Sequence, residues 1–212
     1  AAKSGTSCES CHGASSEWLA LHDNYGGKDV KREQEAPDNK VKRVADSQAA
    51  GLIWPSMQFE VAENCMTCHG LAHPGLKADD LAKMLGAGHP INTDFELVKY
   101  SQGSVRHRHY PPDIKINAEM TPQELANIYA VGQAAALVSA TEAISKSGEA
   151  KYKEAQNKRV EIAKAALSGI SEAAGLLAAP TRQNALSFVK SVAGKDLTGA
   201  IGSKLPAKSD YK

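Results

Sequence analysis

The stretch Cys65-Met66-Thr67-Cys68-His69 decides how this chain folds, because its C-x-x-C-H spacing is the signature of covalent c-type haem attachment. The two thiols add to the porphyrin vinyl groups and the imidazole coordinates iron, so one helical turn fixes cofactor, ligand and backbone together. The same spacing recurs at Cys8-Glu9-Ser10-Cys11-His12, and the two copies contain all four cysteines of the chain. The sequence therefore predicts two covalently attached haem c groups, held by Cys8, Cys11, Cys65 and Cys68, with His12 and His69 as proximal iron ligands.

Pairs of C-x-x-C have other uses in proteins, as a four-cysteine zinc site or as redox-active dithiols. Neither use gives a reason for a histidine to follow both pairs directly. The haem interpretation accounts for the histidines as well as the cysteines, and we prefer it.

Composition bounds the class of protein. At 212 residues with only 5% aromatic side chains, the chain can hold one domain or two small ones. We expect the porphyrins to supply much of the large apolar surface of the core. A net charge of +1, from 25 basic and 24 acidic residues, argues against nucleic-acid binding and against membrane binding driven by charge. No apolar run approaches the ~20 residues that span a bilayer, so no membrane span is expected.

The first residues, Ala1-Ala2-Lys3-Ser4, read like the mature end that remains after a signal peptide has been cleaved. Haem attachment to C-x-x-C-H takes place outside the bacterial cytoplasm. We therefore expect a periplasmic protein whose signal peptide has been removed.

Helical patterns dominate, and we expect an all-α fold. An irregular, haem-packed region with short helices is expected over residues 1–117, followed by a helical bundle or hairpin over 118–212, where cysteine, histidine and tryptophan are absent. The clearest helix start is Thr121-Pro122-Gln123-Glu124, with an N-cap, a proline at the first helical position and a capping-box acid. Helices are expected over 6–22, from about 57 into the second motif, over 78–85, from 121, over 147–178 and from 181. A solvated loop or frayed helix is expected over 28–46, with a docking surface as the alternative. Residues 91–117 are expected to be irregular, and the tail over 204–212 is expected to be frayed.

Within residues 147–178, apolar side chains recur at alternating spacings of three and four, as in a coiled-coil seam. We expect this seam to pack inside the chain, with a homodimer through the C-terminal helices as the alternative. Its members are Val160, Ala163, Leu167, Ile170, Ala174 and Leu177.

The sixth coordination position of each iron decides between functions. A second strong ligand makes a low-spin electron carrier, whereas an open position permits binding and chemistry of small molecules. All the histidines outside the two motifs precede residue 110, in the haem-bearing part of the chain, which favours bis-histidine ligation at both haems. These residues are His22, His73, His89, His107 and His109.

Short runs between residue 8 and about residue 100 resemble the multihaem c-type cytochromes related to the tetrahaem cytochrome of ammonia oxidation, although this chain has two haem motifs. In those proteins a histidine in an A-G-H-P-like run commonly serves as a distal haem ligand. The resemblance implies this role for His89 and for His22. The runs are Cys11-His12-Gly13, Trp18-Leu19 and His22, then Cys68-His69-Gly70, Gly86-Ala87-Gly88-His89-Pro90 and Phe95-Glu96-Leu97.

His22 follows His12 by ten residues, or about three helical turns, so we expect it to point away from that haem. Crossed ligation, with His22 on the second haem and His89 on the first, is therefore open. His73 lies four residues after His69 and would share its helix face only if the helix continued towards Pro74.

A basic cluster surrounds the last two histidines. His107 and His109 flank Arg108, with Arg106 beside them, and such a cluster suits pairing with haem propionates. We prefer propionate contact or a surface role to iron ligation for this pair.

These observations lead to a periplasmic dihaem cytochrome that exchanges electrons with redox partner proteins, a carrier and not an enzyme. The alternative is a haem enzyme or sensor with one open iron that binds peroxide, nitric oxide, nitrite or hydroxylamine, with His107, Arg108 or His109 in its distal pocket. A third hypothesis makes residues 118–212 a docking module that brings the haems to a larger complex.

Overall fold

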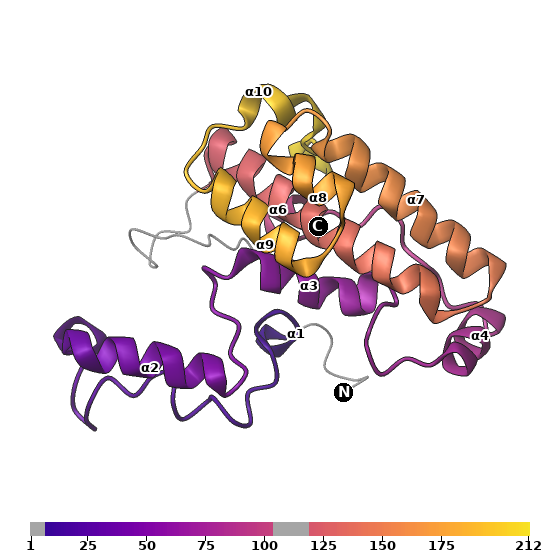
Figure 1. The fold of residues 1–212 in the computed structure, drawn as a ribbon. Coiled ribbons are helices and arrows are strands. Elements are labelled where there is room, and N and C mark those ends of the chain that lie inside the picture. Colours follow the sequence, from indigo (N-terminus) through magenta and orange to yellow (C-terminus); the bar gives the residue numbers. More distant parts are fainter. Residues whose placement is uncertain (1–6, 104–118) are drawn as a thin grey trace. The chain divides into compact units, whose positions relative to one another are not determined.

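The structure is a computed structural model that describes residues 7–103 and 119–212 (Figure 1). Over these ranges it contains ten α-helices, several short 3-10 turns and no strand, which confirms the all-α fold. None of the helices in the described ranges is long and apolar enough to cross a membrane.

The chain divides into two compact units, Ala1–Met57 and Gln58–Lys212, here called the N-terminal and C-terminal units. Each unit carries one C-x-x-C-H motif. This boundary differs from the one we expected between residues 117 and 118, because α3 (Gln58–His69) packs along α6 (Pro122–Ala143). The second haem motif is therefore part of the helical C-terminal unit.

The N-terminal unit contains α1 (Cys8–His12), a 3-10 turn (Arg32–Gln34) and α2 (Pro37–Ala49). The helix expected over 6–22 stops at His12, because Gly13 takes a φ of 83° and approaches the carbonyl of Gly51 so closely that no side chain fits. Over 28–46, where we expect a solvated loop or a frayed helix, the structure has the 3-10 turn and the greater part of α2. Pro37 occupies the first helical position of α2, which a proline favours.

Few side chains of the N-terminal unit are buried. Among its described residues only two hydrophobic side chains, Trp18 and Leu52, are buried, together with the polar Ser47. None of the residues of α1 is buried. A small unit with so few buried apolar side chains gains little stability from its core, and such units are commonly stabilised by a disulfide, a metal or another ligand.

The C-terminal unit is built around α6. Of its 22 residues 14 are buried, on all sides of the helix, which is the pattern of a helix enclosed by others. Thr121 caps it and forms the predicted capping box with Glu124. Figure 1 shows α6 among the other helices, which are α3, α4 (Ala78–Gly86), α5 (Leu97–Ser101), α7 (Ala150–Leu167), α8 (Ala174–Ala178), α9 (Arg182–Val192) and α10 (Thr198–Ile201).

The predicted seam packs within this unit. Ala163, Leu167 and Ile170 are buried in the same core cluster as α6. The single helix expected over 147–178 is divided into two helices: α7 ends at Leu167 and α8 begins at Ala174. Ala174, an expected member of the seam, is exposed.

Two further expectations are corrected in the C-terminal unit. Residues 97–101, in the segment expected to be irregular, form α5. The tail over 204–212 is not frayed, because Tyr211 packs against the core and the Lys212 N–H donates to the Lys99 carbonyl at 2.9 Å.

Gly132 marks a close approach of α6 to α5. A Cβ added there would lie 2.9 Å from the Cβ of Leu97, so a methyl group would push the two helices apart. We predict that Gly132→Ala lowers the free energy of unfolding by about 1 to 2 kcal/mol, measured by denaturant titration. Gly175→Ala in α8 is the control, because an added Cβ there meets no described neighbour within 4 Å and should be neutral or stabilising. Equal destabilisation by the two substitutions would contradict the close packing at Gly132.

Candidate haem attachment sites

The second motif occupies the last turn of α3. Cys65, Cys68 and His69 are three and four residues apart and therefore share one side of the helix. Cys68 is exposed and Cys65 is half-buried, and none of the four cysteines of the chain forms a disulfide. The adjoining face of α3 is anchored in the core by Phe59, Val61, Ala62 and Met66.

The ring of His69 lies against aromatic side chains. It stacks on Phe95 with ring centroids 4.0 Å apart and planes inclined by 21°, and the Tyr100 ring lies 5.4 Å away. Burial lowers the pKa of His69, and the positive charge of Arg159 lowers it further. The neutral imidazole favoured in this way is the form that binds iron.

Three buried side chains of α7 hold the backbone that follows His69, and we call them the α7 clasp: Tyr152, Gln156 and Arg159. The Tyr152 hydroxyl donates to the Leu71 carbonyl at 2.9 Å, and Gln156 Nε2 donates to the Gly70 carbonyl at 2.8 Å. The Arg159 guanidinium packs so tightly on Gly70 that a Cβ there would overlap it.

Sequence reasoning missed this clasp. A signal for it was present in the spacing. Residues 152, 156 and 159 lead to the seam residue Ala163 at intervals of four, three and four, with polar side chains in place of apolar ones. Polar residues on a buried seam need partners, and the turn after the second motif provides them.

The first motif forms α1, with Cys8 exposed and Cys11 and His12 half-buried. His12 and Ile53 exchange two hydrogen bonds: the Ile53 N–H donates to the His12 carbonyl at 3.0 Å, and His12 Nδ1 donates to the Ile53 carbonyl at 2.7 Å. A carbonyl oxygen only accepts, so Nδ1 carries the proton and Nε2 keeps its lone pair. This is the arrangement of a metal-ligating histidine.

The two predicted distal ligands have the same arrangement. His22 Nδ1 donates to the Leu19 carbonyl at 2.7 Å, and His89 Nδ1 donates to the Pro90 carbonyl at 2.8 Å. Each ring therefore presents an Nε2 lone pair. His22 belongs to the N-terminal unit and His89 to the C-terminal unit, and crossed ligation stays a prediction.

His73 differs from these histidines. Its Nδ1 accepts a hydrogen bond from the Gly75 N–H at 3.0 Å, so the proton of the neutral ring lies on Nε2. In this tautomer Nε2 has no lone pair for iron, which makes His73 a poor axial ligand. The other lower-ranked candidates, Arg106, His107, Arg108 and His109, lie outside the described residues.

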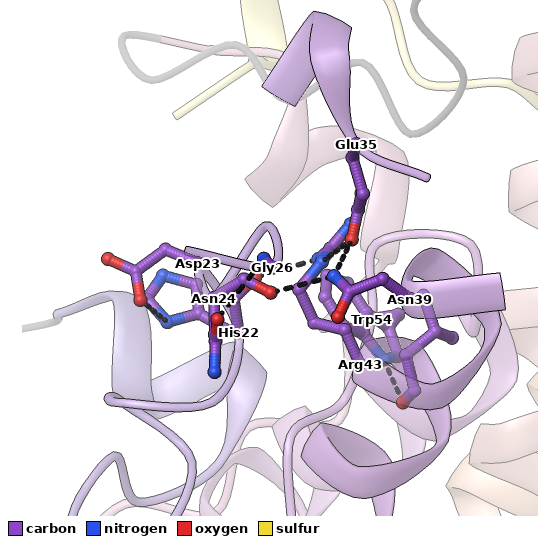
Figure 2. A network of polar contacts seen from close by, with 9 residues as sticks. His22, Asp23, Asn24, Gly26, Glu35, Asn39, Arg43 and Trp54 are labelled. Carbon is purple, nitrogen blue, oxygen red and sulfur yellow. Dashed lines mark hydrogen bonds and ion pairs between the residues drawn. The ribbon is translucent and has the colours of Figure 1, made fainter. Parts of the chain in front are cut away.

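A buried ion pair fixes the turn that carries His22. Arg43 of α2 makes two bonds to the Glu35 carboxylate, both of 2.7 Å, and donates to the His22 carbonyl at 2.7 Å (Figure 2). The guanidinium also lies over the rings of Tyr25 and Trp54, 4.9 and 5.8 Å from their centroids. The side chains of Arg43 and Glu35 are only 8% and 3% exposed, so this charged pair belongs to the interior of the unit.

Two buried polar atoms in the N-terminal unit, Trp18 Nε1 and Ser47 Oγ, have no hydrogen-bond partner among the described residues. The indole of Trp18 meets the His22 ring edge-on, with centroids 5.2 Å apart. Buried polar groups ordinarily have a hydrogen-bond partner. The two thiols and the imidazole of the first motif are a donor set that would fit a covalent haem, which would bring polar acceptors of its own.

Among the described residues, no cluster of three or more His, Cys, Asp or Glu side chains could hold a metal ion. A cavity of about 560 Å³ lies in the C-terminal unit between the start of α6 and the end of α9. Its lining contains no residue of the second motif and includes Met120, Thr121, Asn127, Val189 and Gly194.

Comparisons of this chain with protein-family models, with curated proteins and with solved structures found no match. The two motifs are therefore interpreted from their own chemistry and geometry.

The Arg43–Glu35 pair should make the N-terminal unit sensitive to acid. The bonds from Arg43 hold the pKa of Glu35 below its ordinary value of 4.5, so the carboxylate stabilises the folded unit above that pH. The contribution disappears as the pH falls through the lowered pKa. We predict that amide hydrogen-exchange protection in residues 18–26, corrected for intrinsic rates, falls between about pH 5 and about pH 3.

In Glu35→Gln this protection should already be reduced at the higher pH and should change little with acid. Glu33→Gln, at an exposed neighbouring carboxylate, is the control and should keep the full acid dependence. Identical pH profiles for wild type and Glu35→Gln would show that the pair does not fix this turn.

Proposed function

We propose that this chain is a dihaem c-type cytochrome that carries electrons between redox partner proteins. One haem would be held by Cys8, Cys11 and His12, and the other by Cys65, Cys68 and His69. Each bound haem supplies a one-electron ferric/ferrous couple. The observation that carries the proposal is that both motifs place two unbridged cysteines and a half-buried imidazole at the end of a helix.

The sparse core of the N-terminal unit supports a large apolar ligand at the first motif. Two buried hydrophobic side chains, Trp18 and Leu52, are too few to stabilise a unit of this length. A porphyrin attached at Cys8 and Cys11 would add the missing apolar surface, and the Trp18 N–H would gain an acceptor.

The ring tautomers support a carrier with both irons six-coordinate. His22 and His89 each direct the Nδ1 proton to a backbone carbonyl and so present Nε2 as a ligand. A second imidazole gives a low-spin iron with a lower reduction potential than a thioether ligand would give. An electron carrier is therefore preferred to an enzyme or sensor with an open iron.

The same proposal implies a location and a mode of exchange. Haem attachment to this motif occurs outside the bacterial cytoplasm, so we place the protein in the periplasm. Cys8 and Cys68 are exposed, and porphyrins attached there would reach the surface, where redox partner proteins can exchange electrons with them.

Substitution of the distal histidines tests the ligand assignment. We predict that His22→Ala and His89→Ala each convert one haem from low spin to high spin, because each removes a strong sixth ligand. The readout is the EPR spectrum of the ferric protein, together with carbon monoxide binding to the ferrous form. His73→Ala is the matched control and should leave both haems low-spin.

Rapid stoichiometric binding of carbon monoxide to wild-type protein, or a high-spin signal from a full equivalent of its haem, would favour the open-iron enzyme or sensor instead.

Removing the thiols tests whether the haem forms part of the hydrophobic core of the N-terminal unit. We predict that Cys8→Ala/Cys11→Ala abolishes protease protection of residues 7–57, because the unit buries little else, while residues 119–212 stay protected. Cys65→Ala/Cys68→Ala is the control, since its helix is held by a large core, and should leave the far-UV circular dichroism of α6 and its neighbours nearly unchanged. Protease protection is measured by mass spectrometry of the proteolytic fragments. An N-terminal unit that stays protected without haem would count against the proposal.

A further inference from the structure

Arg159 is a buried cation without a carboxylate partner among the residues that the structure describes. Arg159 as a whole residue is only 5% exposed. Its guanidinium donates to three neutral acceptors: Gln156 Oε1 at 2.5 Å, Met66 Sδ at 3.1 Å and Ser139 Oγ at 3.4 Å. Burying a positive charge among neutral groups is strongly unfavourable, so such a residue is expected to have a compensating role.

The place of this charge is specific. The guanidinium lies directly on Gly70, the residue after His69, and contacts Met66 inside the second motif. Burial lowers the pKa of Arg159 only to about 10, so the side chain remains positive at neutral pH. A fixed positive charge therefore stands beside the second attachment motif.

Among the described residues, the buried arginine of the N-terminal unit differs from Arg159, because Arg43 is neutralised by the two bonds to Glu35. In the C-terminal unit the buried carboxylate of Glu96 caps α5 and accepts from the N–H groups of Val98 and Lys99 at 2.8 and 2.9 Å, and within the described ranges no ion pair joins it to Arg159. In the described part of the chain, a buried cation with neutral partners therefore lies against the second motif.

We infer that Arg159 raises the reduction potential of the haem attached at Cys65 and Cys68 and so makes it the more oxidising of the two. This inference rests on the proposed function. The ferrous iron carries one positive charge fewer than the ferric iron, so a nearby cation in a low-dielectric interior favours the reduced state. An electron that enters the protein would then reside mainly on the second haem.

The test is a potentiometric titration of the full-length protein with both haems, followed by visible absorbance. In Arg159→Met, one of the two couples should move to lower potential, with the ratio of reduced to oxidised haem at a fixed potential falling about tenfold. The other couple should not move. In a Cys8→Ala/Cys11→Ala background, which keeps only the second haem, adding Arg159→Met should lower the remaining couple by the same amount relative to the Cys8→Ala/Cys11→Ala variant itself.

Two variants separate charge from shape. Arg159→Lys keeps the positive charge and should retain most of the potential, whereas Arg159→Gln removes the charge, keeps hydrogen-bonding capacity and gives the same readout if the methionine variant does not fold. Arg182→Gln is the matched control, because Arg182 pairs with Glu60 and Glu63 of the same helix α3 but is about half exposed. Its removal should leave both couples in place.

The outcomes distinguish the two claims. A wild-type protein that does not hold two haems overturns the proposed function and this inference with it. If both variants, Arg159→Met and Arg159→Gln, hold two haems and neither reduction potential moves, the inference alone is overturned. An equal downward shift in Arg159→Lys would also overturn it, since geometry and not charge would then set the potential.

Discussion

The packing of α3 along α6 is the contact on which the C-terminal unit depends. It buries Phe59, Ala62 and Met66 and thereby fixes which side of α3 is left at the edge of the core. Since the side chains of Cys65 and His69 are tied to the same helix, their direction is set by that burial. The α7 clasp then holds the next two carbonyls, so both ends of the second motif are positioned by packing against the protein's own core.

The N-terminal unit follows a different principle. Its ordered elements are held mainly by polar contacts: the reciprocal bonds of His12 and Ile53, and the ion pair of Arg43 and Glu35 beneath the turn of His22. Apolar burial contributes little there. The two attachment motifs thus share a chemical pattern, but one lies on a prebuilt core and the other in a unit that a porphyrin would complete.

The sequence predicted the features that local chemistry determines. The Thr121 capping box marked the start of α6, and the end of α3 coincides with the second motif. Contacts between distant residues were not predictable. The charges of residues 28–46 indicated a solvated loop or a frayed helix, because nothing in the sequence shows that Glu35 and Arg43 pair inside the unit.

The same limit applies to the candidate site. The sequence does not show which ring nitrogen of a histidine carries the proton. The backbone groups beside the rings distinguish the Nδ1 donors His12, His22 and His89 from the acceptor His73. The tail was expected to fray because chain ends commonly do so. Tyr211 packs on the core across a separation that periodicity does not report.

The α7 clasp also has a consequence for the order of assembly. Its bonds join positions that are 81 and 86 residues apart in the chain, so they close late compared with the local turns of α3. If the chain is exported as proposed, it would present the second motif well before Tyr152 and Gln156 reach it. During this interval the cysteines would lie on a loosely held helix, where the enzymes that attach haem can reach them. Closure of the α7 clasp afterwards would fix the second motif in its final conformation.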